Sequence, residues 1–191
     1  MLDTIRDTAA NCKLCDLWKG RKNPVFDKGN PESNIMICGM VPAYEENKKG
    51  IPFVGRAGKL LDEILYNVGL TLDDVYVSNI VKCFLAPGKS LKEEWIDACL
   101  PYLICQISSV APKVIVTLGL DASIGLLGLP ADTKMGSIRG KVHKYGLAIE
   151  VVPTYHPSFL LRKGGSNNDY FPRVVDDFEL TKYIEFQRQS S

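Results

Sequence analysis

The chain has 191 residues and a formal net charge of +1, with 46% hydrophobic and 24% charged residues. These values exclude a mostly disordered chain, a collagen and a coiled coil, and the length predicts a single domain spanning residues 1–191. No apolar run approaches the ~20 residues of a membrane span, and residues 1–7 lack the apolar core of a signal peptide. We therefore expect a cytoplasmic monomer that makes no membrane contact.

Short apolar runs alternate with amphipathic stretches along the chain. The runs predict strands at residues 34–38, 75–78, 113–118 and 147–152. Helices are predicted at residues 57–68, 120–127 and 171–187, and a further one is predicted to begin in the pattern Ser90-Leu91-Lys92-Glu93. That pattern has the form of a capping box. Pro101 should break or restart this helix, which then runs to about Val110.

This alternation predicts an α/β fold, a three-layer α/β/α domain with a four-stranded parallel sheet covered by helices on both faces. Ligands of such sheets bind beside the carboxyl ends of the strands. The loops expected there are residues 39–58, 79–90, 119–120 and 153–165, and three of them are rich in Gly, Pro, Asn and His. We therefore expect the chemistry of the protein to lie in these loops.

Four of the six cysteines have positions that suggest a metal centre. Cys12 and Cys15 form a C-x-x-C pair, Cys83 directly follows the second predicted strand, and Cys99 lies late in the next helix. Four thiolates suit either a tetrahedral zinc ion or a [4Fe–4S] cluster. The other two, Cys38 in a buried strand and Cys105 in an apolar helix, are predicted to be core thiols.

Several segments together resemble a known family. They are Gly39-Met40-Val41-Pro42-Ala43, residues 50–62, 75–83, 98–103 and 112–119, and Pro153-Thr154-Tyr155-His156-Pro157-Ser158. In this order they resemble the family 4 uracil-DNA glycosylases over most of the chain. The resemblance implies hydrolysis of the N-glycosidic bond of uracil in DNA, as part of base excision repair, with single- or double-stranded DNA as the partner.

The resemblance also implies a cofactor and the roles of several residues. The four cysteines matching the family's ligands are Cys12, Cys15, Cys83 and Cys99, which would bind a structural [4Fe–4S] cluster.

Three residues would handle the flipped base. The side-chain amide of Asn79 can match O4 and N3–H of uracil and mismatch cytosine. The ring of Phe53 can stack on the base, and His156 can donate a hydrogen bond to O2 as negative charge builds there.

The segment after His156 is expected to contact the DNA. Phe159 or Leu160 would enter the duplex where the base leaves it, and Arg162 and Lys163 would hold the adjacent phosphates.

The first motif departs from the family pattern. Typical members read Gly-Glu-Ala-Pro-Gly where this chain has Met40 in second place and Ala43 in fifth. The predicted consequences are a substrate-contacting Met40, tolerance of other deaminated or modified bases, and a shift of the water-polarising carboxylate to Glu46. The alternative is a non-catalytic iron–sulfur protein of the same fold that binds DNA or a base.

Overall fold

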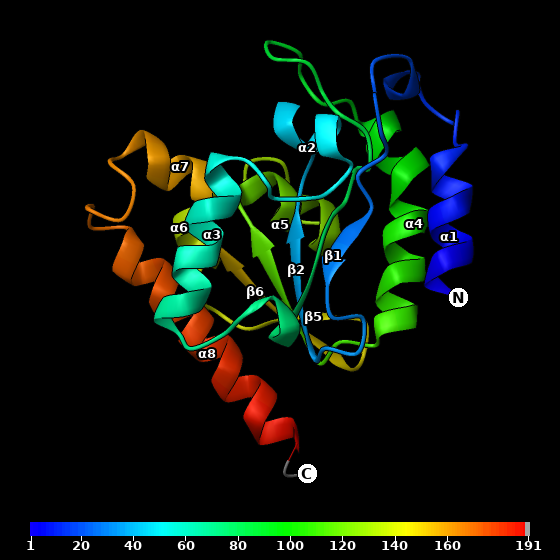
Figure 1. Ribbon diagram of the computed structural model, residues 1–191. Helices are drawn as coiled ribbons and strands as arrows, with labels where there is room; N and C mark the ends of the chain where they lie inside the picture. The colour runs from blue at the N-terminus through cyan, green and yellow to red at the C-terminus, as the bar shows by residue number, and fades with distance from the viewer. Residues whose placement is uncertain (190–191) are drawn as a thin grey trace.

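A mixed sheet of six strands lies between two layers of helices in the computed structural model, which describes residues 1–189 (Figure 1). The strand order is β1-β3-β2-β4-β6-β5, and the four central strands run parallel to one another. The strands are β1 (Asp27–Gly29), β2 (Ile35–Gly39), β3 (Val75–Asn79), β4 (Val114–Leu118), β5 (His143–Tyr145) and β6 (Ile149–Thr154).

The prediction of a four-stranded, wholly parallel sheet is therefore wrong. The four predicted strands form the parallel centre, but β1 pairs antiparallel with β3 and β5 pairs antiparallel with β6. Each added strand has three residues and is polar, with the sequences Asp-Lys-Gly and His-Lys-Tyr. Short charged edge strands discourage pairing with other chains, and they carry no apolar run by which a sequence pattern could find them.

The helices are α1 (Leu2–Ala10), α2 (Tyr44–Lys49), α3 (Arg56–Asn67), α4 (Glu93–Val110), α5 (Leu120–Leu127), α6 (Met135–Ile138), α7 (Pro157–Arg162) and α8 (Phe171–Gln189). Short 3-10 turns lie at Asp16–Lys19 and Leu72–Asp74. The structure confirms the predicted helices at residues 57–68, 120–127 and 171–187 as α3, α5 and α8. None of the described helices is both long and apolar enough to cross a membrane.

Helix α4 differs from its prediction at two points. It begins at Glu93 after Lys92, and no side chain caps its first turn, so the predicted capping box at Ser90 is wrong. The helix also continues through Pro101 without a break. The Pro101 ring lies on the exposed face, while buried residues such as Leu103 hold the other face of the helix against the sheet.

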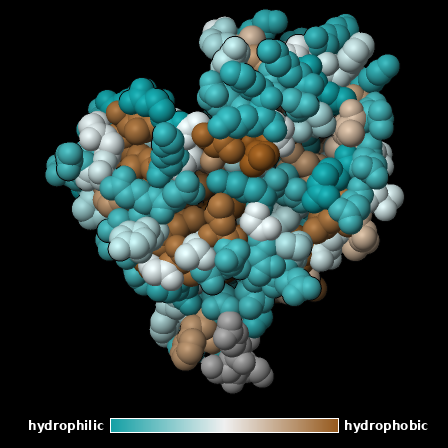
Figure 2. Space-filling model, viewed as in Figure 1, coloured by the Kyte–Doolittle hydropathy of each residue, from teal (hydrophilic) through white to brown (hydrophobic). Residues whose placement is uncertain are grey.

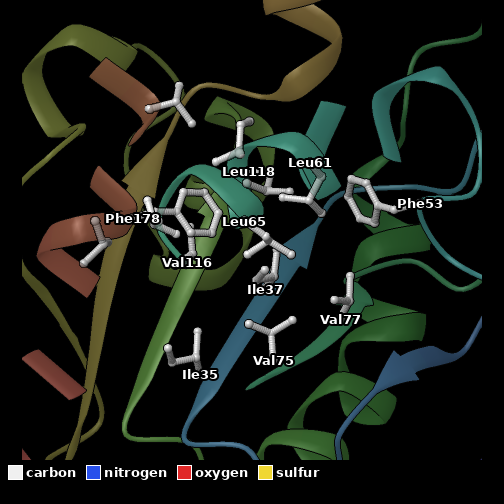
Figure 3. Packing of buried hydrophobic residues seen from close by; sticks show 14 of the residues in the cluster. Ile35, Ile37, Phe53, Leu61, Leu65, Val75, Val77, Val116, Leu118 and Phe178 are labelled. Carbon is white, nitrogen blue, oxygen red and sulfur yellow. The ribbon is translucent and has the colours of Figure 1, made fainter. Parts of the chain in front are cut away.

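Alternate residues of the central strands face the two helical layers. On β2, Ile35 and Ile37 face the layer that contains α3 and α8, whereas Met36 and Cys38 face the layer that contains α4 and α5. Figure 3 shows Leu61 and Leu65 of α3 packed over the first of these faces. Every residue of β2, β3 and β4 is buried, as expected for parallel strands covered on both faces.

The four central strands all end at one edge of the sheet. Gly39 of β2 is in register with Asn79 of β3, and β4 and β6 end beside them at Leu118 and Thr154. The loops predicted to carry the chemistry therefore start side by side.

Candidate active site

Four of the predicted site residues line one small pocket at this edge of the sheet. They are Glu46, Phe53, Asn79 and His156, and the pocket wall also contains Val41, Pro42, Ala43 and Ala57. We call this the inner pocket. It brings together residues from α2, from the loop before α3, from the end of β3 and from the segment after β6.

The side chain of Asn79 closes the inner pocket at the end of β3. Asn79 is only 2% exposed. Within residues 1–189 its side-chain amide has no hydrogen-bond partner, whereas every fully buried polar side-chain atom in that range has one, so the amide atoms of Asn79 are not fully buried. The donor and the acceptor of the amide are therefore open to the pocket. A Cβ on Gly39 would lie 2.3 Å from Asn79 Oδ1 and 2.7 Å from Phe53 Cζ, so any other residue there would displace these two side chains.

The loop that carries Phe53 is held in an unusual conformation. Phe53 has φ of +50°, a left-handed value that is uncommon for a residue with a side chain and carries strain. Lys28 Nζ donates a hydrogen bond to the Phe53 carbonyl oxygen at 3.0 Å. The ring of Phe53 lies 6.0 Å from the ring of His156, measured between centroids. An aromatic face and an imidazole thus line the same pocket.

Glu46 holds the same loop from its other side. Its Oε1 atom accepts hydrogen bonds from the backbone N–H groups of Val54 and Gly55, each at 3.0 Å. Glu46 is 6% exposed, and within the described residues Oε2 takes no hydrogen bond. The carboxylate therefore positions the loop through Oε1, and Glu46 is also part of the wall of the inner pocket.

Lys28 is a loop-positioning residue that sequence reasoning missed. It lies in the edge strand β1, which no apolar pattern marks. Burial lowers the pKa of Lys28, and the carboxylates of Asp62 and Glu46 partly offset that effect.

The geometry around His156 defines its protonation state. Its Nδ1 atom accepts a hydrogen bond from the Ser158 backbone N–H at 3.0 Å and lies 2.8 Å from Ser158 Oγ. Burial lowers the pKa of His156 to about 4, with a further lowering by the Arg162 guanidinium and a smaller opposing effect of Glu46. The imidazole is therefore neutral, and its proton lies on Nε2, which remains a donor.

A larger cavity of about 540 Å³ adjoins the inner pocket and shares Val41, Ala43, Ala57 and His156 with it. We call this the outer cavity. Its remaining wall is mostly apolar and comes from Met40, Leu118, Gly119, Leu120, Asp121, Met135, Tyr155, Ser158, Phe159 and Arg162. Figure 2 shows a notch in the molecule between the α7 and α2 regions, with apolar surface beside it. The cavity is open enough for a ligand much larger than a base.

The side chain of Met40 does not line the inner pocket. It is 8% exposed, packs in the α4 and α5 layer, and its Sδ and Cε atoms lie 3.8 Å from the position of a Cβ on Gly125. Ala43 is the altered residue of the first motif that faces the inner pocket. Met40 lines the outer cavity instead, so its predicted contact with the substrate stays a prediction.

The predicted DNA-contacting residues separate into two groups. Leu160 is completely buried in the α3 and α8 core, so the prediction that it enters a duplex is wrong. Phe159 is half-buried, stacks on Tyr155 with 5.1 Å between centroids, and lines the outer cavity. Arg162 and Lys163 are exposed beside it. Helical periodicity explains the error, since adjacent residues of α7 face different ways.

Cys12, Cys15, Cys83 and Cys99 line a single pocket between α1, α4 and the loop after β3. Two N–H donors point at the sulfurs: Arg21 Nη1 lies 3.3 Å from Cys83 Sγ, and the Lys82 backbone nitrogen lies 3.2 Å from Cys99 Sγ. Such donors stabilise thiolate ligands. Four thiols that line one pocket are a donor set that suits either a tetrahedral zinc ion or a [4Fe–4S] cluster.

The two remaining cysteines differ from each other. Cys38 is buried in β2, which confirms the prediction of a core thiol. Cys105 is exposed on α4, so the same prediction for Cys105 is wrong. The apolar helix sequence suggested burial all round, but only one face of α4 packs against the sheet.

The chain matches the model of the Uracil DNA glycosylase superfamily over residues 26–179. It is also similar to proteins named Type-4 uracil-DNA glycosylase. The one from Saccharolobus solfataricus is 42% identical over 167 residues, which are 84% of this chain and 77% of that protein. The one from Pyrobaculum aerophilum is 38% identical over 88% of this chain and 89% of that protein. The one from Sulfurisphaera tokodaii is 40% identical over 84% of this chain and 76% of that protein.

Substitution of Gly58 tests how tightly α3 packs against the Phe53 loop. A Cβ at Gly58 would lie 1.9 Å from the Phe53 carbonyl oxygen. Gly to Ala in a helix normally stabilises by up to about 1 kcal/mol, but overpacking here should make Gly58→Ala about 1–3 kcal/mol less stable. Urea denaturation measures the difference. Gly136→Ala in α6 is the control, because nothing lies within 4 Å of a Cβ there. Stability equal to or above that of the parent would contradict the packing described.

The protonation of His156 should differ from that of an ordinary histidine. Nitrogen NMR should find Nδ1 unprotonated and Nε2 protonated at pH 6, with protonation of Nδ1 only as the pH approaches about 4. Because an unfolded histidine binds its proton near pH 6.5, the contribution of His156 to stability is full above pH 6.5 and falls as the pH drops toward 4. A midpoint near 6.5 would show that the ring is not held in this way.

Proposed function

The chain belongs to the uracil DNA glycosylase superfamily, and we propose that its inner pocket holds a uracil base while the N-glycosidic bond to the DNA is hydrolysed. The protein is a uracil-DNA glycosylase, a hydrolase of DNA repair. The observation that carries the proposed site is the convergence of Asn79, Phe53 and His156 on one pocket. With all three residues present, nothing favours the non-catalytic alternative.

The reaction sets the requirements that the pocket must meet. The base has to leave the stack, and cleavage then produces an oxocarbenium-like sugar and an anionic pyrimidine. The buried amide of Asn79 offers one donor and one acceptor, which pair with O4 and N3–H of uracil. Cytosine presents the opposite arrangement at these positions and would leave the amide unpaired. The ring of Phe53 provides an apolar face for the base.

His156 would stabilise the leaving base. Its Nδ1 is engaged by Ser158, so Nε2–H is the donor available for uracil O2. A hydrogen bond from a neutral imidazole strengthens as negative charge develops on O2, and it needs no proton from solvent. The same donor does not attract the phosphates of undamaged DNA as a cation would.

Glu46 would orient the attacking water. Oε1 is occupied by the loop, whereas Oε2 has no hydrogen-bond partner among the described residues, and Glu46 lines the inner pocket. A carboxylate in this place can both accept a hydrogen bond from water and stabilise positive charge on the sugar. This role replaces the acidic residue that the first motif lacks.

The outer cavity would receive the DNA next to the extruded nucleotide. Phe159 lines it and offers an apolar side chain for the gap left in the stack. The exposed Arg162 and Lys163 beside it suit the phosphates. We propose that the chain acts as one domain, since both core clusters pack on the same sheet, and that it acts as a monomer.

We propose tolerance of bases other than uracil. Ala43 lines the inner pocket with one methyl group, a small side chain although larger than the glycine of the family pattern, so a base with a small substituent can still fit. Met40 contributes to the outer cavity.

The cysteine pocket would hold a [4Fe–4S] cluster through Cys12, Cys15, Cys83 and Cys99. When bound, the cluster supplies structural cross-linking and no step of the hydrolysis. Its four cysteine ligands would connect the N-terminal segment to α4 and to the loop after β3. That loop directly follows the base-reading Asn79.

Asn79→Ala tests the function together with the proposed reading of the base. Duplexes containing one uracil, or a normal base, are end-labelled, incubated with protein and treated with alkali to cleave abasic sites. The parent should cleave the uracil duplex only. Loss of a buried amide that pairs with the base should slow excision about ten- to a hundredfold and leave the affinity for a duplex without uracil unchanged.

Asn67→Ala is the control, because Asn67 is exposed at the end of α3. No excision by the parent would refute the function. Equal excision by Asn79→Ala and the parent would refute the role of Asn79.

The cofactor proposal predicts the metal content. Protein purified without oxygen should be brown and contain about four irons per chain. Cys83→Ser should lose most of the iron, whereas Cys105→Ser should retain it because Cys105 lies on the exposed face of α4. Iron and zinc are measured by plasma mass spectrometry. Stoichiometric zinc without iron in the parent would contradict the proposal.

A further inference from the structure

A buried lysine lies between the inner pocket and the cysteine pocket. Lys82 is 2% exposed, follows Asn79 by three residues and directly precedes Cys83. Lysine is almost never fully buried unless its charge is matched. No carboxylate within residues 1–189 forms an ion pair with Lys82, so its burial requires another explanation.

The ammonium group of Lys82 has three hydrogen-bond acceptors around it. Nζ donates to Ser78 Oγ at 2.9 Å, to Gln106 Oε1 at 2.5 Å and to the carbonyl oxygen of Asn79. An ammonium has three donors and no acceptor, so the group is saturated by this set. The ring of Phe26 lies 5.6 Å from Nζ and adds a cation–π contact.

The acceptors are themselves fixed by other contacts. Gln106 Nε2 donates to the Phe26 carbonyl at 3.2 Å and to Tyr76 Oη at 2.8 Å. Ser78 Oγ donates to the same carbonyl at 2.7 Å. A fully satisfied buried network of this kind is rigid. The ammonium group of Lys82 is therefore held in one position, and from there it can fix the position of the Asn79 peptide.

Two side chains among the described residues donate to the Asn79 carbonyl oxygen. They are Lys82 through Nζ and Ser78 through Oγ, the latter at 3.5 Å. The peptide that carries this carbonyl also sets the direction of the Asn79 side chain. The backbone N–H of Lys82 donates a hydrogen bond to Cys99 Sγ at 3.2 Å, and both residues line the cysteine pocket.

We propose that Lys82 is a positioning residue for uracil excision, which fixes the Asn79 peptide so that the side-chain amide meets the base. The inference rests on the function proposed above. Lys82 does not reach the inner pocket and takes no part in the chemical step. Through its backbone it also joins the peptide of Asn79 to the cysteine pocket.

A double-mutant cycle tests this role. Single-turnover uracil excision is measured for the parent, Lys82→Met, Asn79→Ala and the double variant, together with iron content and thermal unfolding of each. Lys82→Met should slow excision about a hundredfold, the effect of a small misplacement of a reacting group. In the Asn79→Ala background the same change should slow excision less than about twofold, because contacts within one network are not additive.

Binding gives a readout that does not depend on turnover. The parent should bind a duplex with non-cleavable 2′-fluoro-deoxyuridine more tightly than a duplex with thymidine. Lys82→Met should lose this preference and keep its affinity for the thymidine duplex. Tyr76→Phe is the matched control. It removes a buried hydroxyl from the same network, bonded to Asp27 and Gln106 but not to Asn79, and it should keep both the preference and the excision rate.

Several outcomes would overturn the proposal. The first is that Lys82→Met slows excision by the same factor in the parent and in the Asn79→Ala background. The second is that Tyr76→Phe slows excision as much as Lys82→Met does. The third is that Lys82→Met keeps the binding preference for the uracil analogue. If Lys82→Met does not fold, Lys82→Gln enters the same cycle with the same expected result. A parent that excises no uracil would instead refute the proposed function, so the two failures are distinguishable.

Discussion

The base pocket depends on the close approach of two side chains to the backbone at Gly39. Asn79 Oδ1 from β3 and Phe53 Cζ from the loop before α3 would lie 2.3 and 2.7 Å from a Cβ at Gly39, so a side chain there would displace both. The parallel pairing of β2 with β3 places Gly39 opposite Asn79. The amide and the aromatic ring therefore face each other across a gap that the sheet itself defines, and a base can be read only while this contact is kept.

Hydrogen bonds with charged side chains hold the Phe53 loop, whose backbone is strained, in place beside Gly39. The left-handed conformation of Phe53 is unfavourable alone, but Lys28 binds its carbonyl and Glu46 binds the next two N–H groups. On the other side of Gly39, the buried network around Lys82 holds the peptide of Asn79. Burial raises the strength of both sets of contacts, since the local dielectric constant is low. The site is thus organised before any DNA arrives.

The sequence predicted the central strands and four of the eight described helices, because apolar periodicity records these elements directly. Most of the residues that meet in the inner pocket were predicted from the resemblance of the loop motifs to a known family. The sequence could not predict β1 or the role of Lys28, since a three-residue polar edge strand has no pattern. It also could not say which way single side chains of a helix face. Leu160 and Cys105 were assigned to the wrong environments for that reason, because tertiary packing alone decides which face of α7 or α4 is covered.

The central claim is that Asn79 binds O4 and N3–H, and His156 binds O2, of one extruded uracil. A crystal structure of the protein bound to a duplex with non-cleavable 2′-fluoro-deoxyuridine tests it most directly. The account predicts the Asn79 amide within hydrogen-bond distance of O4 and N3, roughly 2.7–3.2 Å, with His156 Nε2 at O2 and the Phe53 ring against the base. A base lodged in the outer cavity, with the Asn79 amide turned away from it, would contradict the account.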